Sequence, residues 1–303
     1  MERIIRLLRN RDFILIMALT FGLLSGGGAR WTEKTILPAL ALVMTLSTMG
    51  VPGSIFFSPR KLVAPALVGI AVNYGVLGSL LLGTSRLFIG DEALRDGFVI
   101  MTAVPPAIAV IPFSVILNGN QTFALIATIG CYLGALILTP AIALQFLGEA
   151  FGDPGKIATI MIELILLPLL LSRVLLWMRW AEKIDPFKGT ITNWSFFLVT
   201  YTIVGLNRQL FFERPMALVL PALIALASTF LMGWVIEWIG RLIRIDSKTI
   251  ISLVLLGTQK NTGLAAGLAL TLFSEKTAVP ATITTIFMLV YMIWLSFRQR
   301  LEG

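Results

Sequence analysis

Long apolar runs recur along the chain and are separated by short charged or Gly/Pro-rich segments. A helix needs roughly 20 mostly apolar residues to cross the hydrocarbon core of a bilayer. The runs therefore predict ten helical spans, at residues 12–29, 35–57, 62–84, 96–117, 121–147, 156–178, 190–210, 215–240, 249–273 and 277–297. We expect an all-α membrane protein in which short loops join the spans.

The fourth of these runs, FVIMTAVPPAIAVIPFSVIL, holds Pro105 and Pro106 side by side. A proline lacks the N–H that a helix needs and clashes with the preceding turn, so the pair predicts an opened helix near mid-membrane. The freed carbonyls find no partners in hydrocarbon, so such a break must be buried in protein or line a wet cavity. A helix that is only kinked is the alternative.

The ninth run, IISLVLLGTQKNTGLAAGLALTLF, is interrupted by the polar stretch 257–263. Lys260 lies near its middle, too far from either end for its side chain to reach the interface easily. A charge at this depth costs on the order of 2.5–3.5 kcal/mol, so the ammonium must be paired, solvated or functional. One interpretation is a structural lysine satisfied by carbonyls and side chains. The other is a functional lysine beside an anion.

Five spans followed by five more would place the two halves of the chain in opposite orientations. An offset of 155 residues brings Pro105 and Pro106 opposite Lys260 and Asn261, so the two interruptions coincide. We expect a 5+5 inverted repeat whose broken fourth and ninth helices cross. The second halves of these helices would then point their positive N-terminal ends at one place, where an anion is the natural ligand.

The composition narrows the class of protein. Apolar residues make up 57% of the 303 residues and charged residues 13%, whereas soluble domains carry about 25% charged residues. The basic residues behind the net charge of +8 lie between apolar blocks, so nucleic acid is not an expected partner. Histidine is absent and Cys131 is the only cysteine. We therefore expect no enzyme, no metal site and no cofactor.

The distribution of lysine and arginine predicts the orientation. Fifteen of the 24 fall in segments on the side of the N-terminus and eight on the other side. By the positive-inside rule, both termini are expected in the cytoplasm of a cell (inner) membrane. A cleaved signal peptide is the alternative for the N-terminal segment, which has four arginines before its first apolar run.

Three segments resemble the bile acid:sodium symporter (BASS) family, within the bile/arsenite/riboflavin transporter superfamily. Where that family has Pro-Gly-Gly-Thr-Ala-Ser-Asn in its fourth span, this chain has 105–111, PPAIAVI, followed by Gly119-Asn120 and by ILTP at 137–140. Where the family has Glu-x-Gly-x-Gln-Asn-Ser-Gly-Leu-Ala in its ninth span, this chain has LGTQKNTGLA at 256–265. In the third span, NYG at 73–75 replaces Gln-Phe-Gly. The resemblance extends over nearly the whole chain.

The resemblance implies two subdomains with the substrate between them. Panel helices one and two would span 1–57 and panel helices six and seven 151–212. Core helices three to five would span 58–150 and core helices eight to ten 213–303. It also implies alternating access by motion of the core past the panel.

The chain departs from the family at the positions that hold sodium. Val110, Ile111 and Leu256 replace a Ser-Asn pair and a Glu, and they offer no side-chain oxygen, which hard cations require. Lys260 replaces a Gln. Our hypothesis is that its ammonium stands in for a sodium ion, which makes sodium coupling doubtful. A lysine that alternates between charged and neutral forms would couple transport to protons, and one that stays charged would support uncoupled movement or exchange.

The polar residues near the two interruptions are the candidates for substrate or ion binding: Lys260, Asn261, Thr262, Gln259, Asn73, Pro105, Pro106, Thr128 and Glu163. For Thr128 we favour a hydrogen bond between helices. For Glu163 we favour an outer aqueous vestibule, with proton binding or pairing with Lys260 as the alternative.

The sequence thus predicts a secondary transporter of a small, carboxylate-like organic anion. A membrane sensor or binding protein of the same fold without transport is the alternative. A channel is disfavoured because the chain has no charged ring or carbonyl filter motif. The identity of the anion, the direction of transport and the oligomeric state are left open.

Overall fold

The computed structural model describes residues 10–50, 59–148, 159, 162–213 and 215–302. Within these ranges the chain forms helices joined by short connections, which confirms the all-α fold. The helices of the first half are α2 (Arg11–Leu24), α3 (Ala29–Thr32), α4 (Ile36–Thr48), α5 (Pro59–Ile70), α6 (Gly78–Phe88), α7 (Glu92–Ala103), α8 (Val110–Ile116) and α9 (Gln121–Leu147). Those of the second half are α11 (Leu167–Trp177), α12 (Ala181–Leu206), α13 (Arg208–Glu213), α14 (Val219–Leu226), α15 (Met232–Leu242), α16 (Ser247–Thr258), α17 (Thr262–Leu272) and α18 (Val279–Glu302).

Three wide π-helical turns interrupt the α-helices. They are η4 (Ala71–Leu77), η6 (Ile162–Leu166) and η8 (Ala227–Leu231). Short 3₁₀ turns complete the connections: η1 (Gly26–Gly28), η2 (Glu33–Thr35), η7 (Pro215–Leu218) and η9 (Lys276–Ala278).

Length and composition make several of these helices fit to cross a bilayer. Four continuous ones qualify: Leu62–Phe88, Gln121–Leu147, Pro215–Leu242 and Lys276–Gln299. A fifth is the pair Phe13–Leu24 and Gly26–Leu46, bent by 89°. Shorter apolar helices coincide with the predicted sixth span and with the two halves of the ninth. The chain has the helices of a multi-pass membrane protein, while the count of ten spans stays a prediction.

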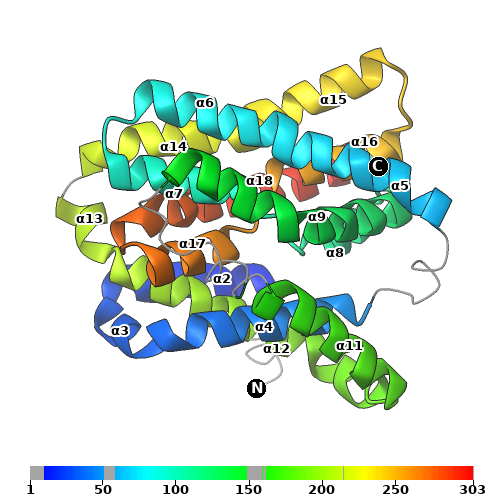
Figure 1. Ribbon diagram of the computed structural model, residues 1–303, viewed down its shortest axis with the longest axis horizontal. Coiled ribbons are helices and arrows are strands. Elements are labelled where there is room, and N and C mark those ends of the chain that lie inside the picture. The colour runs from blue at the N-terminus through cyan, green and yellow to red at the C-terminus, as the bar shows by residue number, and fades with distance from the viewer. Residues whose placement is uncertain (1–9, 51–58, 149–158, 160–161, 214, 303) are drawn as a thin grey trace.

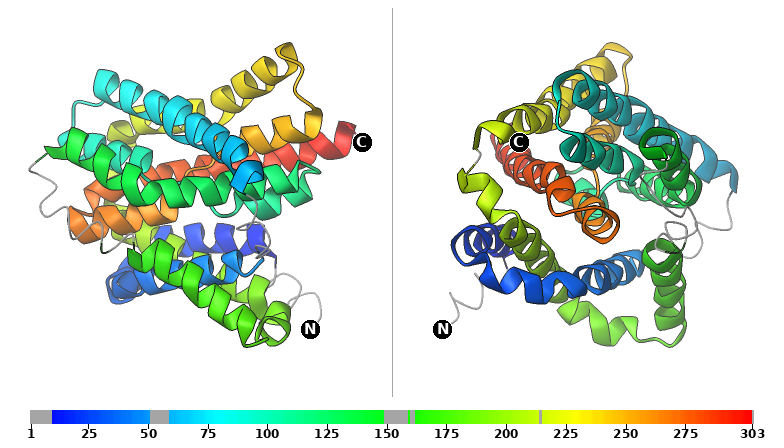
Figure 2. Two further views of the ribbon diagram at one scale, coloured as in Figure 1. Left: turned by 45° about the vertical axis from the view of Figure 1, so that its right-hand side comes forward. Right: turned by 60° about the vertical axis from the view of Figure 1, so that its left-hand side comes forward.

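The helices form two layers (Figure 1). In one layer, α12 packs along α2 and α4, and α11 packs on α4. In the other, α5 packs on α9, α15 on α16, and α14 on α18. Figure 2 shows the separation of the layers from two further sides. The first layer holds the helices expected for a panel and the second those expected for a core, and the boundaries given above stay a prediction.

Two elements differ from their predicted limits. Helix α12 begins at Ala181, nine residues before the predicted span 190–210, and α18 continues to Glu302, beyond the predicted end at 297. The prediction followed apolar residues, and these mark the part of a helix that lipid covers. A helix can continue past that part because its backbone hydrogen bonds do not depend on the hydropathy of the side chains.

Candidate functional site

The first break separates α7 from α8. Helix α7 ends at Ala103, Val104 is extended (φ −78°, ψ 153°), and α8 begins at Val110. The opened helix predicted from Pro105 and Pro106 is therefore confirmed, and a simple kink is not what the chain forms. The Ala103 carbonyl, which the break frees, accepts a hydrogen bond from Thr139 Oγ1 at 2.7 Å.

The second break separates α16 from α17. Helix α16 ends at Thr258, Gln259 is extended (φ −111°, ψ 94°), and α17 begins at Thr262. Asn261 caps α17, because its side-chain oxygen accepts a hydrogen bond from the Leu264 amide at 3.0 Å. Asparagine is among the best N-cap residues, which explains why the helix restarts here.

The two breaks cross and are joined through their backbones. Ala107 N donates to Gln259 O at 2.9 Å, and Asn261 N donates to Pro105 O at 3.0 Å. Pro106 and Lys260 form an isolated antiparallel bridge between these bonds. Each unwound segment thus satisfies part of the other, as buried backbone requires.

Lys260 lies at this crossing and is only 1% exposed. Its Nζ donates to Asn73 Oδ1 at 2.8 Å, to Thr102 O at 2.9 Å and to Val104 O at 2.8 Å. The ammonium has three N–H donors, so all three are used. The centre of the Tyr74 ring lies 4.4 Å from Nζ, which adds a cation–π contact. The protein thus solvates the charge with neutral oxygens and an aromatic face.

Asn73 is oriented by a second hydrogen bond. Its side-chain nitrogen donates to Leu256 O at 2.8 Å, which turns its oxygen toward Lys260. The residue is fully buried in η4. It therefore contacts the lysine and the second break and is not among the residues that line the cavity described next.

A cavity lies between the crossing and the helices α2, α4 and α12. Its atom-free space is about 1040 Å³, counting its opening. Most of its wall is apolar, and its polar residues come from the second break and from α9, α12, α17 and α18: Tyr132, Thr200, Gln259, Lys260, Asn261, Thr262, Thr282 and Thr285. A mostly apolar pocket with a few convergent polar groups is typical of a small-molecule site.

Several hydrogen-bond donors on this wall are unused by the described residues. The amides of Ile108 and Ala109, which precede α8, and of Gly263, in the first turn of α17, have no acceptor there. The Tyr132 hydroxyl accepts from Asn261 Nδ2 at 3.0 Å and keeps its own proton available. Unused donors in a cavity wall next to the N-terminus of a helix, such as the Gly263 amide, favour a negatively charged group.

The predicted site residues divide into three groups. Gln259, Lys260, Asn261 and Thr262 line the cavity. Asn73, Pro105 and Pro106 belong to the crossing. Thr128 and Glu163 lie apart from the cavity wall.

The hydrogen bond expected for Thr128 is wrong. Thr128 is 1% exposed on α9, and its Oγ1 has no hydrogen-bond partner in the described part of the chain. The Ala124 carbonyl, four residues earlier on α9, is the usual local acceptor for a helical threonine, and the Thr128 hydroxyl does not bond to it either.

The alternative in which Glu163 pairs with Lys260 is also wrong. Glu163 is exposed in η6, and the contacts of the Lys260 ammonium are the three neutral oxygens and the Tyr74 ring. Whether Glu163 faces an outer vestibule stays a prediction.

Sequence reasoning missed Tyr74, Tyr132 and Thr200. A tyrosine in an apolar span carries a detectable signal, because its hydroxyl usually needs a partner when it is buried. Thr200 carries none, since threonines occur on many helices of this chain.

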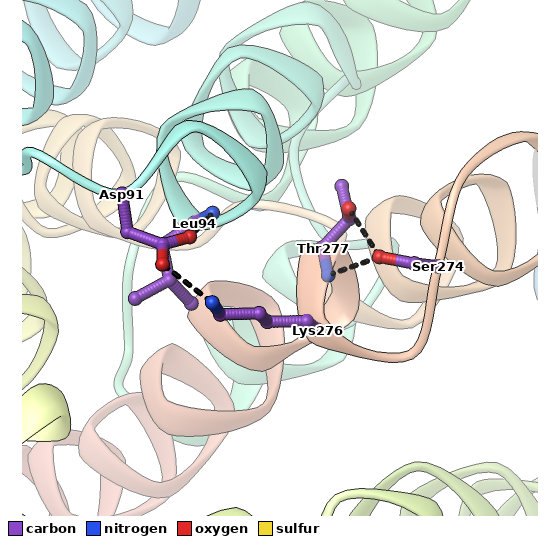
Figure 3. A network of polar contacts seen from close by, with 5 residues as sticks. All are labelled: Asp91, Leu94, Ser274, Lys276 and Thr277. Carbon is purple, nitrogen blue, oxygen red and sulfur yellow. Dashed lines mark hydrogen bonds and ion pairs between the residues drawn. The ribbon is translucent and has the colours of Figure 1, made fainter.

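Helices α7 and α16 begin in the same way, each with an aspartate as its N-cap. Asp91 caps α7 by accepting from the Leu94 amide at 3.2 Å and pairs with Lys276 of η9, where Ser274 and Thr277 also bond to each other (Figure 3). Partial burial raises the pKa of Asp91, but the hydrogen bonds from Lys276 and Leu94 outweigh it, so the net pKa is lowered. Asp246 caps α16 in the same way, through the Thr249 amide at 3.0 Å.

Comparison with known proteins places the chain in a family. No curated protein matches it. A family model does match, over residues 32–298. The resemblance inferred from the two breaks is confirmed at the level of the bile/arsenite/riboflavin transporter superfamily, to which that family belongs. The chain is a member of the SBF-like CPA transporter family.

Proposed function

We propose that the protein is a secondary transporter that carries a small, carboxylate-like organic anion by alternating access, without classical sodium coupling. The observation that carries the proposal is the crossing of the two breaks, where a buried ammonium lies beside a cavity with unused donors. Membership of a transporter family supports the movement of a solute across the membrane.

The charge balance of the site favours an anion. Lys260 contributes a full positive charge with no carboxylate among its contacts. The N-terminus of α17 adds the positive end of a helix dipole, and its Gly263 amide is free to donate. A carboxylate would accept these hydrogen bonds and offset the positive charge of the lysine.

The oxygens around Lys260 support the idea that its ammonium replaces sodium. Asn73 Oδ1, Thr102 O and Val104 O converge on one point, and oxygen is the ligand type that hard cations require. In this chain Nζ occupies that point. A positive charge that the protein itself supplies leaves no need for a sodium ion at the same place, so flux is expected to be independent of sodium.

An inverted repeat with ten spans is part of the proposal, and the two halves support it. Asp91 and Asp246, the caps of α7 and α16, are 155 residues apart, and so are the last residues of these helices, Ala103 and Thr258. The π-helical turns η4 and η8 begin 156 residues apart. With an odd number of spans in each half, both termini would lie on the cytoplasmic side of the inner membrane.

The test is a flux assay in proteoliposomes with a panel of short carboxylates, run under sodium and proton gradients imposed separately. We expect flux that sodium does not change, and slower flux for Lys260→Gln and Lys260→Ala. A response to the proton gradient would assign proton coupling, and its absence would assign uncoupled movement or exchange. Uptake and pH dependence that are unchanged in both variants would refute the role of Lys260.

A membrane sensor of the same fold is the second candidate. The observation that favours it is the number of hydrogen bonds at the crossing, which would resist the motion that transport needs. The Lys260 ammonium by itself makes three, one to Asn73 of η4 and two to carbonyls at the first break. Specific binding of a carboxylate without flux in the same vesicles would favour the sensor.

A further inference from the structure

Thr200 is a polar side chain that the panel layer contributes to the cavity. It belongs to α12, is 7% exposed and lines the cavity wall. Its hydroxyl has no hydrogen-bond partner within the described ranges of the chain. Its oxygen is not among the fully buried atoms that lack a partner, so it is accessible from the cavity and can bond to a molecule there.

Other threonines of the same region behave differently. Thr202, two residues further along α12, donates to Leu198 O at 2.7 Å. Thr282 and Thr285 on α18 donate to carbonyls four residues earlier, at 3.1 and 2.8 Å. A threonine in a helix readily makes this local bond. Thr200 does not, and its hydroxyl remains available for a partner outside the chain.

The position of Thr200 relates it to the proposed anion site. Val199, the preceding residue, approaches Gly263, since a Cβ added at Gly263 would lie 3.7 Å from Val199 Cγ1. Gly263 is in the first turn of α17 and offers the unused amide described above. Thr200 and Gly263 thus line the same cavity from neighbouring parts of α12 and α17.

We propose that Thr200 is a specificity-determining residue that binds a second oxygen function of the substrate. This inference rests on the proposed function, in which the carboxylate meets the N-terminus of α17. The substrate class is then a short carboxylic acid with a hydroxyl or oxo group close to the carboxylate and an apolar remainder that contacts Leu40, Val43 and Met44. Such a molecule is held by both layers at once.

The experiment measures binding of two matched probes, pentanoate and 2-hydroxypentanoate, to the purified full chain, together with their uptake in proteoliposomes. We expect the wild-type protein to bind the hydroxy acid about tenfold more tightly, which is the usual worth of one hydrogen bond. Thr200→Val should remove this preference and leave the affinity for pentanoate unchanged. Thr200→Ser should keep the preference, because serine retains the hydroxyl.

Thr202→Val is the matched control on the same helix. Its hydroxyl bonds within the protein, to Leu198 O and Thr32 Oγ1, so the change should lower thermal stability and leave the ratio of the two affinities as in wild type. A preference that survives Thr200→Val, or that is lost in Thr200→Ser, overturns the inference. Equal wild-type affinities overturn it too, while the proposed function stands. Failure of the wild type to bind or move either probe contradicts both.

Discussion

The change Lys260→Met tests whether the ammonium holds the two breaks together. Methionine keeps an unbranched side chain of similar length and removes the charge and the three donors. Asn73 Oδ1, Thr102 O and Val104 O would then lose their partner. The two carbonyls belong to the first break, where no helical amide can replace the lysine.

The expected loss follows from these three oxygens. A buried acceptor left without a donor costs about 1–3 kcal/mol. The variant no longer buries a charge, and this gain offsets part of the cost of the three unpaired oxygens. We therefore take about 1 kcal/mol for each oxygen and expect the free energy of unfolding to fall by about 3 kcal/mol. For a chain of this size that corresponds to a fall of roughly 5–10 °C in Tm.

Cys131 provides the assay. It is the only cysteine of the chain, and it is free and buried on α9. A thiol-reactive fluorophore therefore labels the protein only when the second layer opens, and the labelling rate during heating gives Tm in detergent. No cysteine needs to be introduced or removed.

Lys276→Met is the matched control. Lys276 also contacts another part of the chain, but its partner is the Asp91 carboxylate and its side chain is 42% exposed. An exposed ion pair contributes at most about 1 kcal/mol, so its removal should shift Tm by no more than a few degrees. The reasoning is refuted if Lys260→Met unfolds with the Tm of the wild type, or with the same small shift as Lys276→Met.

Three further predictions concern the same elements. Lys260→Gln should allow sodium to raise Tm, because three oxygens already converge at the point that Nζ leaves and the new amide adds a fourth. The Tm of the wild type should be the same in sodium and in potassium. Tyr132→Phe removes a donor to the cavity and the acceptor of the Asn261 amide, so it should weaken carboxylate binding about tenfold in a titration. Asp91→Asn keeps the helix cap and removes the charge. Because the pKa of Asp91 is lowered in the folded protein, the contribution of its charge to stability is present at neutral pH and is lost as the pH falls below about 3.9. The Tm values of the variant and the wild type should therefore differ slightly at pH 7 and converge in acid.

The sequence located the two breaks but not what joins them. Pro105 and Pro106 act through local sterics, and a polar run inside an apolar span is visible by inspection, so both positions follow from the chain alone. The carbonyl partners of Lys260 lie more than 150 positions away in the sequence, and no local pattern marks them as its partners. A contact across the fold depends on packing that hydropathy does not encode.

The remaining site residues show the same limit. Thr128 is expected to bond to another helix, but its hydroxyl has no partner in the described part of the chain. Glu163 is a partner for Lys260 only if a carboxylate neutralises the buried ammonium. Backbone carbonyls freed by the first break do this instead. Thr200 is one of many threonines in the apolar helices, and the sequence does not show which of their hydroxyls stay unbonded.

The wide turn η4 constrains the length of the chain around it. A π-turn holds one residue more than an α-turn, and each residue of a helix rotates its neighbours by about 100°. A Cβ added at Gly75 in this turn would meet no atom within 4 Å, so there is space for a small side chain at this position. Its deletion would turn the wide turn into an α-turn, which keeps α5 and α6 in register but changes the direction of the residues between them, including Asn73. A one-residue gap is therefore expected to break the hydrogen bond from Lys260 to Asn73.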